Sequence, residues 1–425
     1  MPNQSLYDFS PIVQLILMGA LVALGPLLWI GLRHQGATPV RRLQALTMLA
    51  LFLTFDLTLF GAFTRLTDSG LGCPDWPGCY GNASPVGARH DIAMAQAALP
   101  SGPVTHGKAW IEMTHRYLAT GVGALILTLA LLTWIERRRQ RRLPVPGRPS
   151  AGSAPGGSNL PAFSAWWPTA TLAWVCLQGA FGAWTVTLQL YPAIVTLHLL
   201  GAIVLLILLC IQGVRYSQTA AGRSPTIVPS PLRTLLLVTS GLLILQIALG
   251  GWVSTNYAVL ACTQFPTCQD SWWPAMNFAQ GFELRRGLGL TSAGVPIDFS
   301  ALTAIHYVHR LMAYVVFVAL GVLAWRLHRV APLQRQANWL AGLALLQLAT
   351  GLGNVLLGWP LAAAVLHTGG AAALAVVLTW AVCESRRASA NALAGNNPVS
   401  PPVAPTPSFA VPAQALHRTA PRLPT

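Results

Sequence analysis

Long apolar runs recur along the chain, separated by shorter polar stretches. A helix needs about 20 predominantly apolar residues to cross the hydrocarbon core of a membrane. Nine runs approach or exceed that length, near residues 11–32, 44–64, 111–134, 165–187, 192–214, 233–255, 301–325, 336–357 and 361–383. The first has neither a basic region before it nor a small-residue cleavage site, so we expect a retained helix rather than a signal peptide. The pattern predicts an all-α polytopic membrane protein.

The composition agrees with a chain that is surrounded by lipid. Hydrophobic residues make up 54% of it and charged residues 9%, whereas soluble domains carry about 25% charged residues. The formal net charge of +15 could indicate a nucleic-acid-binding protein. The basic residues instead form short clusters between apolar runs, with no basic, aromatic-rich soluble domain. We therefore expect the lipid bilayer, and not nucleic acid, as the partner of this chain.

Basic clusters follow every second apolar run. They contain Arg33, Arg41 and Arg42, then Arg137, Arg138, Arg139, Arg141 and Arg142, then Arg215, Arg223 and Arg233, then Arg326, Arg329 and Arg335, and finally Arg386 and Arg387. Cytoplasmic loops of membrane proteins are enriched in arginine and lysine. We therefore expect a bacterial inner-membrane protein with a periplasmic N-terminus and a cytoplasmic C-terminus.

Two long loops on the expected outer side each carry a pair of cysteines. Cys73 and Cys79 lie in the loop near 65–110, and Cys262 and Cys268 lie in the loop near 256–300. An oxidising outer compartment permits disulfides, so we predict one disulfide in each loop. Its role stays open between fastening the loop and exchanging with a thiol protein.

The chain contains an internal repeat. GAFTRLTDSGLGCPDWPGC at 61–79 matches GGWVSTNYAVLACTQFPTC at 250–268 in the spacing of its first glycine and both cysteines. The tripeptides at 114–116 and 308–310 also correspond, as do Leu-Gln-x3-Gly at 177–182 and 346–351. A parallel repeat has its axis along the membrane normal. We therefore predict two pseudo-symmetric four-helix bundles in parallel repeat, plus one extra N-terminal transmembrane helix.

The repeat suggests five segments. They are the extra helix with its cytoplasmic loop at 1–43, the first four-helix half at 44–214, a cytoplasmic linker at 215–232, the second half at 233–383 and a disordered cytoplasmic tail at 384–425. The stretches 143–162 and 388–425 are rich in small residues and proline, and they bury too little apolar surface to offset chain entropy.

Four histidines stand at related positions in the repeat: His115, His198, His309 and His367. Each lies five to nine residues inside a span that enters from the outer side, which places it roughly 10 Å below the outer surface. Haem iron takes two axial imidazoles, so two such pairs predict two haems. A lone histidine could instead bond a neighbouring helix, and a transition metal would need more ligands than each half offers.

The two halves differ beside these histidines. Glu112 precedes His115 by three residues and shares its helix face, while His306 takes the matching place before His309. A carboxylate near a haem edge could accept a proton, which makes the first half the candidate reacting site. Glu112 could instead only orient His115 or Arg116. His306 is interpreted as a residue behind the ligands, with a direct ligand or a helix contact as alternatives.

Three arginines are candidate partners for haem propionates. Arg116 and Arg310 each follow a predicted ligand, and Arg65 ends its span at the outer side. Guanidinium groups pair well with carboxylates. The alternative is that their charged ends extend to the membrane surface.

These residues and motifs closely resemble those of the haem A synthase family of cytochrome oxidase assembly. The resemblance covers about 44–383 and rests on RLTDSGL at 65–71 leading into Cys73–Cys79, ExxHR at 112–116, HLLG at 198–201, VHR at 308–310 and LHxGG at 366–370. The second half departs from the first motif, since Ser254 replaces the arginine and Thr263-Gln264-Phe265 replaces Pro-Asp-Trp. This departure supports a substrate site in the first half.

The resemblance implies a resident haem b held by His309 and His367, and haem O near His115, His198 and Glu112. It implies an enzyme that oxidises the C8 methyl of haem O to the formyl of haem A. The route is successive hydroxylation with oxygen from water, together with an electron acceptor that the sequence does not identify. Haem O synthase and cytochrome oxidase assembly factors are candidate partners. Competing hypotheses are a di-haem b cytochrome exchanging electrons with quinone and a haem carrier or exporter. Glu112 beside one pair favours the enzyme.

Overall fold

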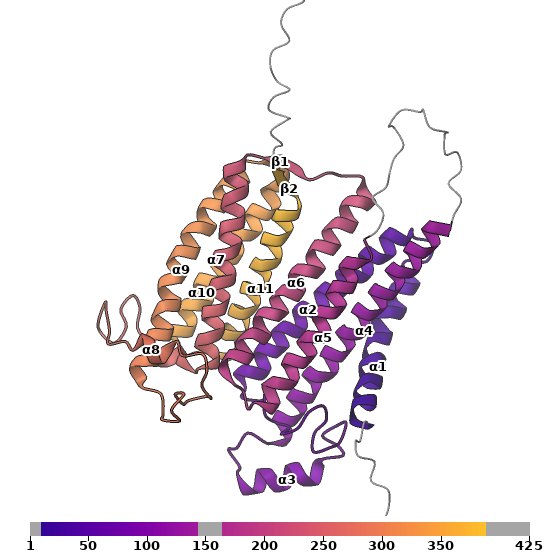
Figure 1. Ribbon diagram of the computed structural model, residues 1–425. Helices are drawn as coiled ribbons and strands as arrows, with labels where there is room; N and C mark the ends of the chain where they lie inside the picture. Colours follow the sequence, from indigo (N-terminus) through magenta and orange to yellow (C-terminus); the bar gives the residue numbers. More distant parts are fainter. Residues whose placement is uncertain (1–9, 143–163, 388–425) are drawn as a thin grey trace, which may run out of the picture. The chain divides into compact units, whose positions relative to one another are not determined.

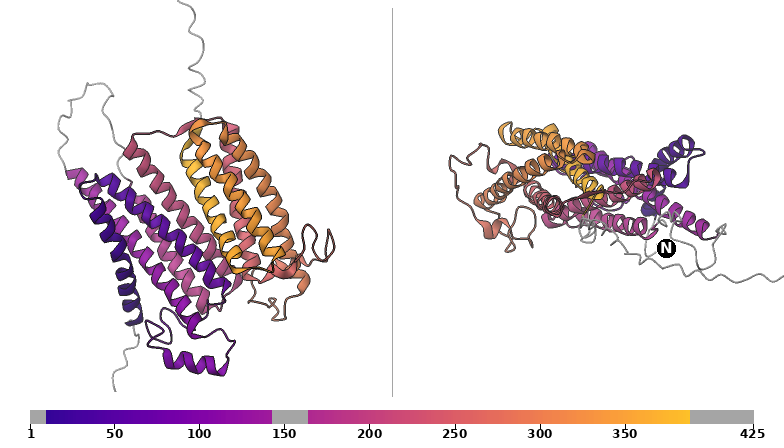
Figure 2. Two further views of the ribbon diagram at one scale, coloured as in Figure 1. Left: turned by 180° about the vertical axis from the view of Figure 1, so that it is seen from behind. Right: turned by 90° about the horizontal axis from the view of Figure 1, so that it is seen from above.

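The computed structural model describes residues 10–142 and 164–387. The segments expected to be disordered, 143–162 and 388–425, lie outside the described residues. The described residues are mainly helical, and the long helices run side by side (Figures 1 and 2).

Eleven α-helices, two short 3-10 helices and two short strands make up the described chain. In order they are α1 Ser10–Arg33, α2 Pro39–Leu66, α3 Arg89–Ala98, α4 His106–Arg142, α5 Trp166–Thr187, α6 Pro192–Ala221, β1 Thr226–Val228, α7 Ser230–Thr255, η1 Ala258–Ala261, α8 Phe278–Gly281, α9 Phe299–His328, η2 Ala331–Leu333, α10 Gln334–Leu356, α11 Leu361–Cys383 and β2 Ser385–Arg387.

Helix ends follow local sequence signals. Thr38 precedes α2, and its hydroxyl accepts the backbone N–H of Arg41 at 3.5 Å, which satisfies a donor that the helix leaves free. α6 begins with Pro192, whose missing N–H costs nothing in the first turn. It ends before Gly222, which has φ +60° and so adopts the left-handed conformation that stops a helix.

Eight helices in the described chain are long and apolar enough to cross a membrane, so it is a multi-pass helical membrane protein. They account for eight of the nine expected spans. The ninth, expected near 165–187, is the helix α5, which is not among the eight. Tryptophans, threonines and Gln178 lower its mean hydropathy, although it lies between α4 and α6 and contacts both.

The packing of the helices follows the order of the repeat. α2, α4, α5 and α6 contact one another in a closed ring, since α2 contacts α4 and α6, and α5 contacts α4 and α6. α7, α9, α10 and α11 form the corresponding ring. α6 and α11 contact each other between the rings, and α1 packs outside the first ring, mainly on α4. Loop conformations repeat as well, because Asp68 and Tyr257 both have positive φ, at 51° and 54°.

The start of α7 and the end of α11 are joined by the strands β1 and β2 and by polar contacts. β1 and β2 pair in parallel, with Thr226 opposite Ser385. Arg233 at the start of α7 donates to the carbonyl oxygens of Val382, at 2.6 Å, and Ser385, at 2.9 Å. The tail was expected to be disordered from residue 384, but order extends through β2 because its backbone completes this pair.

At the opposite end, side chains join the two rings directly. The Arg65 guanidinium donates to the Ser254 carbonyl at 2.6 Å and lies over the Tyr257 ring, 4.0 Å from its centroid. The Tyr257 hydroxyl donates to Asp68 at 2.6 Å. Burial raises the pKa of Tyr257, so the hydroxyl stays protonated as a donor. Arg65 and Ser254 occupy matching places in the repeat, as do Asp68 and Tyr257.

We predict that Tyr257→Phe weakens this junction without opening the core. The variant loses the bond to Asp68 but keeps the ring under Arg65, so the cost should be about 1 kcal/mol. Thermal unfolding in detergent measures it. Tyr314→Phe is the control, because Tyr314 is exposed and no hydrogen bond is described for its hydroxyl. Equal midpoints for the two variants would contradict the prediction.

Candidate functional site

The imidazoles of the first half lie on α4 and α6, each against a glycine of the preceding span. A Cβ atom placed on Gly61 would lie 3.0 Å from His115 Nε2, and one on Gly182 would lie 3.6 Å from His198 Cε1. Phe60 stacks on His115 with ring centroids 6.4 Å apart. The imidazoles of His115 and His198 lie near each other.

The second half repeats this arrangement on α9 and α11. A Cβ atom placed on Gly250 would lie 2.9 Å from His309 Cε1, and one on Gly351 would lie 3.3 Å from His367 Cε1. The imidazoles of His309 and His367 also lie near each other. All four histidines are half-buried. The structure therefore brings the predicted histidines together in two pairs, one in each ring.

Polar side chains contact the ring nitrogens of the second histidine pair, but no such contact is described for the first pair. The Gln246 amide lies 3.1 Å from His309 Nδ1 and donates to the His309 carbonyl at 3.1 Å. The Thr350 hydroxyl lies 2.9 Å from His367 Nδ1. By contrast, His198 Nδ1 is buried with no hydrogen-bond partner in the described chain. A bond to one ring nitrogen fixes the tautomer and directs the other nitrogen toward a metal.

The histidine pairs suit haem by their chemistry. Imidazole is a usual axial ligand of haem iron, and each imidazole lies against a glycine, where a larger side chain would contact it. Among the described residues, His, Cys, Asp and Glu form no cluster of three that could hold a metal ion alone.

Glu112 makes two contacts near the start of α4, beside the Cys73–Cys79 loop. Its Oε2 accepts the Cys73 backbone N–H at 2.7 Å, and its Oε1 accepts from Arg116 at 2.5 Å. The carboxylate is 4% exposed. Such a carboxylate can position the Cys73–Cys79 loop and can also accept a proton if the ion pair is released.

Arg116 and Arg310 bind corresponding carbonyls in the two disulfide loops. Arg116 donates to the Pro77 carbonyl at 3.2 Å and to the Gly78 carbonyl. Arg310 donates to the carbonyls of Pro266 and Thr267 at 3.3 and 3.4 Å. The structure thus places both guanidinium groups on loop backbone, and propionate binding by either stays a prediction.

The remaining predicted residues have partners of their own. His306 Nδ1 lies 3.1 Å from the Ala258 carbonyl of η1, and the side chain is buried. Arg65 belongs to the junction with Ser254 and Tyr257. The disulfides Cys73–Cys79 and Cys262–Cys268 are both formed, each with Cα atoms 4.9 Å apart, so that prediction is confirmed.

Sequence reasoning missed Gln246, Thr350 and a buried arginine. Gln246 lies one turn before Gly250 and Thr350 directly precedes Gly351, so the glycine positions were an available signal. Arg286, 2% exposed, donates to Asn256 Oδ1 at 2.5 Å. Its Nε has no described hydrogen-bond partner, and burial lowers the pKa of Arg286. Arg286 lies in a loop, where the sequence has no periodic pattern that could predict its burial.

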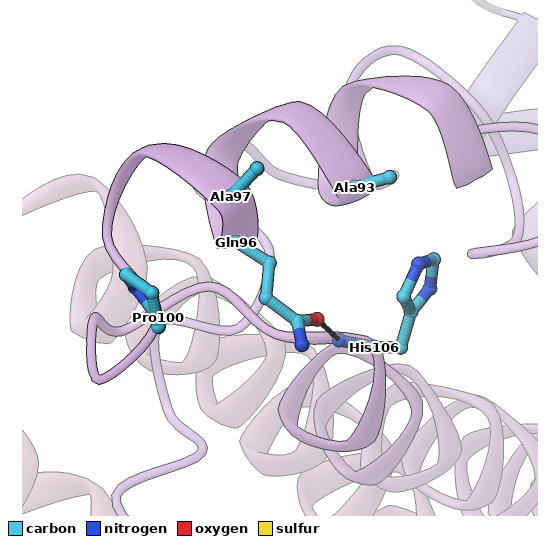
Figure 3. Close-up of a pocket in the computed structure, with 5 residues that line it drawn as sticks. All are labelled: Ala93, Gln96, Ala97, Pro100 and His106. Carbon is cyan, nitrogen blue, oxygen red and sulfur yellow. Dashed lines mark hydrogen bonds between the residues drawn. The ribbon is translucent and has the colours of Figure 1, made fainter.

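One open pocket, beside α3 and the start of α4, stands apart from the histidine pairs. It has a volume of about 380 Å³ and lies beneath α3, where the His106 backbone N–H donates to Gln96 Oε1 at 3.1 Å (Figure 3). None of the four paired histidines lines it. The polar side chains that line it are those of His106 and Gln96.

The fold and site define a multi-pass helical membrane protein that carries two histidine pairs on its long apolar helices, near two disulfide-closed loops. The chain belongs to the cytochrome oxidase assembly protein family, whose model matches residues 44–379.

Several relatives are named heme A synthase. The protein of Shewanella oneidensis is 38% identical over 79% of this chain and 94% of its own length. That of Rhizorhabdus wittichii is 27% identical over 81% and 95% of the two chains, and that of Halalkalibacterium halodurans 24% identical over 72% and 85%.

We predict that Glu112 and Arg116 are energetically coupled. Glu112→Gln leaves the buried Arg116 without its counter-charge, which should cost about 3 kcal/mol. Glu112→Gln/Arg116→Gln removes both charges and should cost less than the sum of the single changes. Thermal unfolding of the four proteins of this cycle measures the coupling.

The matched control is Glu136→Gln, on the same helix, because no ion pair is described for Glu136. It should leave the midpoint unchanged. Simple additivity of the Glu112 and Arg116 changes would show that the two side chains act independently.

Proposed function

We propose that this protein is a haem A synthase, an enzyme that converts haem O into haem A. Its family and the names of its relatives support this assignment. The assignment of a different haem to each half rests on one observation. The imidazoles of the second pair have hydrogen-bond partners, whereas His198 Nδ1 has none among the described residues. In the proposed reaction the C8 methyl of haem O becomes a formyl group through successive hydroxylations, with oxygen taken from water.

The proposed architecture has two four-helix halves, 44–214 and 233–383, related by a pseudo-twofold axis along the membrane normal, with α1 as an extra helix. The matching contact rings support it. The direct pairing of Arg65 with Ser254 and of Asp68 with Tyr257 supports it further. Residues at equivalent places in two repeats meet only near an axis that relates them.

The second half is the proposed site of a resident haem b, with His309 and His367 as axial ligands. Gln246 and Thr350 restrain their rings. Restrained ligands lose little conformational entropy on binding, which suits a cofactor that stays in place. The haem iron would supply one-electron redox chemistry when bound.

The first half is the proposed substrate site, with His115 and His198 beside the iron of haem O. His198 lacks a described hydrogen bond on Nδ1, and looser ligands suit a haem that must enter and leave. Glu112, one turn from His115, is the proposed proton acceptor. It takes up a proton at a carboxylate oxygen as its contact with Arg116 is released. Arg65, Arg116, Arg310 and His306 remain candidate propionate or supporting residues.

The proposed location is a bacterial inner membrane, with the disulfide loops and the N-terminus in the periplasm. Arginine-rich helix ends lie opposite the two disulfides along the helices, in agreement with the positive-inside rule. Haem O synthase and oxidase assembly factors are proposed partners, and a separate electron acceptor completes the oxidation.

Conversion of haem O tests the proposed function. The full chain is expressed in a host that makes haem O but lacks haem A synthase, and extracted haems are separated by chromatography. Haem A should appear with the wild type. Glu112→Gln should lose at least about tenfold of the conversion, as expected for a proton-transfer group, while retaining the resident haem spectrum. Without haem A from a wild-type chain that carries haem, the enzyme assignment fails.

The ligand assignment has its own test. We expect His309→Ala and His367→Ala each to lose the low-spin optical spectrum of the resident haem, because each removes an axial imidazole. His90→Ala is the control, since His90 is exposed in the first outer loop. If the spectrum persists in both variants and is lost in His115→Ala, the halves are assigned the wrong way round.

A further inference from the structure

The turn between α1 and α2 surrounds an open pocket that the proposed enzyme activity does not use. It has a volume of about 610 Å³, within the usual range of ligand pockets. Arg33, His34 and Arg41 line it together with Gln44 and Met48. Much of the pocket precedes residue 44, where the family match begins.

The cations around this pocket have no counter-charge in the described chain. Both described ion pairs, Arg65–Asp68 and Arg116–Glu112, lie elsewhere. Arg33 and Arg41 are exposed, and His34 Nδ1 is a buried atom without a described hydrogen-bond partner. Basic groups gathered around a hollow without an acid favour an anion there.

A solvated basic surface is the simpler explanation for such arginines, but others at the same end of the helices behave differently. Arg137, Arg215 and Arg329 each lie over a tryptophan ring, with Arg329 3.9 Å from the Trp325 centroid. Arg33 and Arg41 have no such stacking partner among the described residues and instead line the pocket.

The pocket also adjoins apolar surface. Met48 on its wall is 47% exposed, and Trp29 and Leu32, on the last turns of α1, are 58% and 69% exposed. These side chains lie on helices that span the membrane. A phosphate group in the pocket could therefore belong to a molecule whose acyl chains follow the helices.

We propose that this pocket binds the phosphate group of an anionic phospholipid. Arg33 and Arg41 pair with the phosphate oxygens, and basic pockets at helix ends are known to take such headgroups. α1 packs mainly on α4 and has few contacts with α2. A headgroup bound by Arg33 and Arg41 would therefore add a contact between the end of α1 and the start of α2.

Lipid retention by the purified full-length protein tests the proposal. Delipidated protein in detergent is titrated with phosphatidylglycerol or phosphatidylcholine, and bound lipids are counted by native mass spectrometry. Phosphatidylglycerol should bind at least about tenfold more tightly. Equal binding of the two lipids by the wild type would overturn the proposal whatever the variants do.

The variant Arg33→Gln/Arg41→Gln should reduce phosphatidylglycerol binding about tenfold or more. Arg326→Gln/Arg329→Gln is the matched control, because it removes two arginines at the same end of another helix, α9, and should keep the binding. An equal loss of phosphatidylglycerol binding in the two double variants would show that only the general surface charge matters, and it would overturn the proposed site. Competition by millimolar inorganic phosphate as strong as that by the lipid would identify free phosphate as the ligand and overturn the lipid assignment.

Discussion

The close approach of Gly61 to His115 and of Gly250 to His309 is the constraint on which the helix arrangement depends. α2 and α7 can lie against α4 and α9 because Gly61 and Gly250 have no side chain at the crossing. A methyl group on Gly250 would come within 2.9 Å of the His309 ring, closer than van der Waals contact allows. In a bilayer, small residues permit such close packing where the hydrophobic effect supplies no attraction between helices. Each of these two imidazoles therefore lies directly against the backbone of the neighbouring helix.

The same framework holds two histidine pairs that differ in their hydrogen-bond partners. Thr350 and Gln246 support the imidazoles of the second half, whereas the repeat places Phe181 and Leu57 at the corresponding positions of the first half. The apolar side chains offer no bond to a ring nitrogen. Under the proposed function, a few polar side chains would decide how firmly each histidine pair holds its haem, so that one haem stays and the other exchanges.

Most of the fold follows from the sequence because lipid imposes a simple rule on length and polarity. Apolar runs of spanning length predicted the eight membrane helices, and the repeat predicted which histidines lie together. α5 departs from the rule because Gln178 and several tryptophans lower its apolarity, while neighbouring helices cover part of its surface. The ion pair of Glu112 with Arg116 was foreseen only as an alternative. The partner of Arg65 was not foreseen, since it depends on how distant loops fold over the helix ends, and periodicity carries no information on that.

The position of Glu112 connects the outer loop with the proposed chemistry. Its carboxylate accepts the Cys73 N–H and the Arg116 guanidinium, and both interactions favour the charged form. Protonation would weaken both contacts at once, and Arg116 would retain its bonds to the carbonyls of Pro77 and Gly78. In the second half, His306 occupies the corresponding place and contacts the Ala258 carbonyl of η1, while the Cys262–Cys268 loop is held by the bond that Gln264 donates to Asp270 at 2.9 Å. In the proposed reaction, a proton taken up by Glu112 would therefore weaken its contact with the Cys73 backbone, whereas His306 in the second half contacts η1 instead of its disulfide loop.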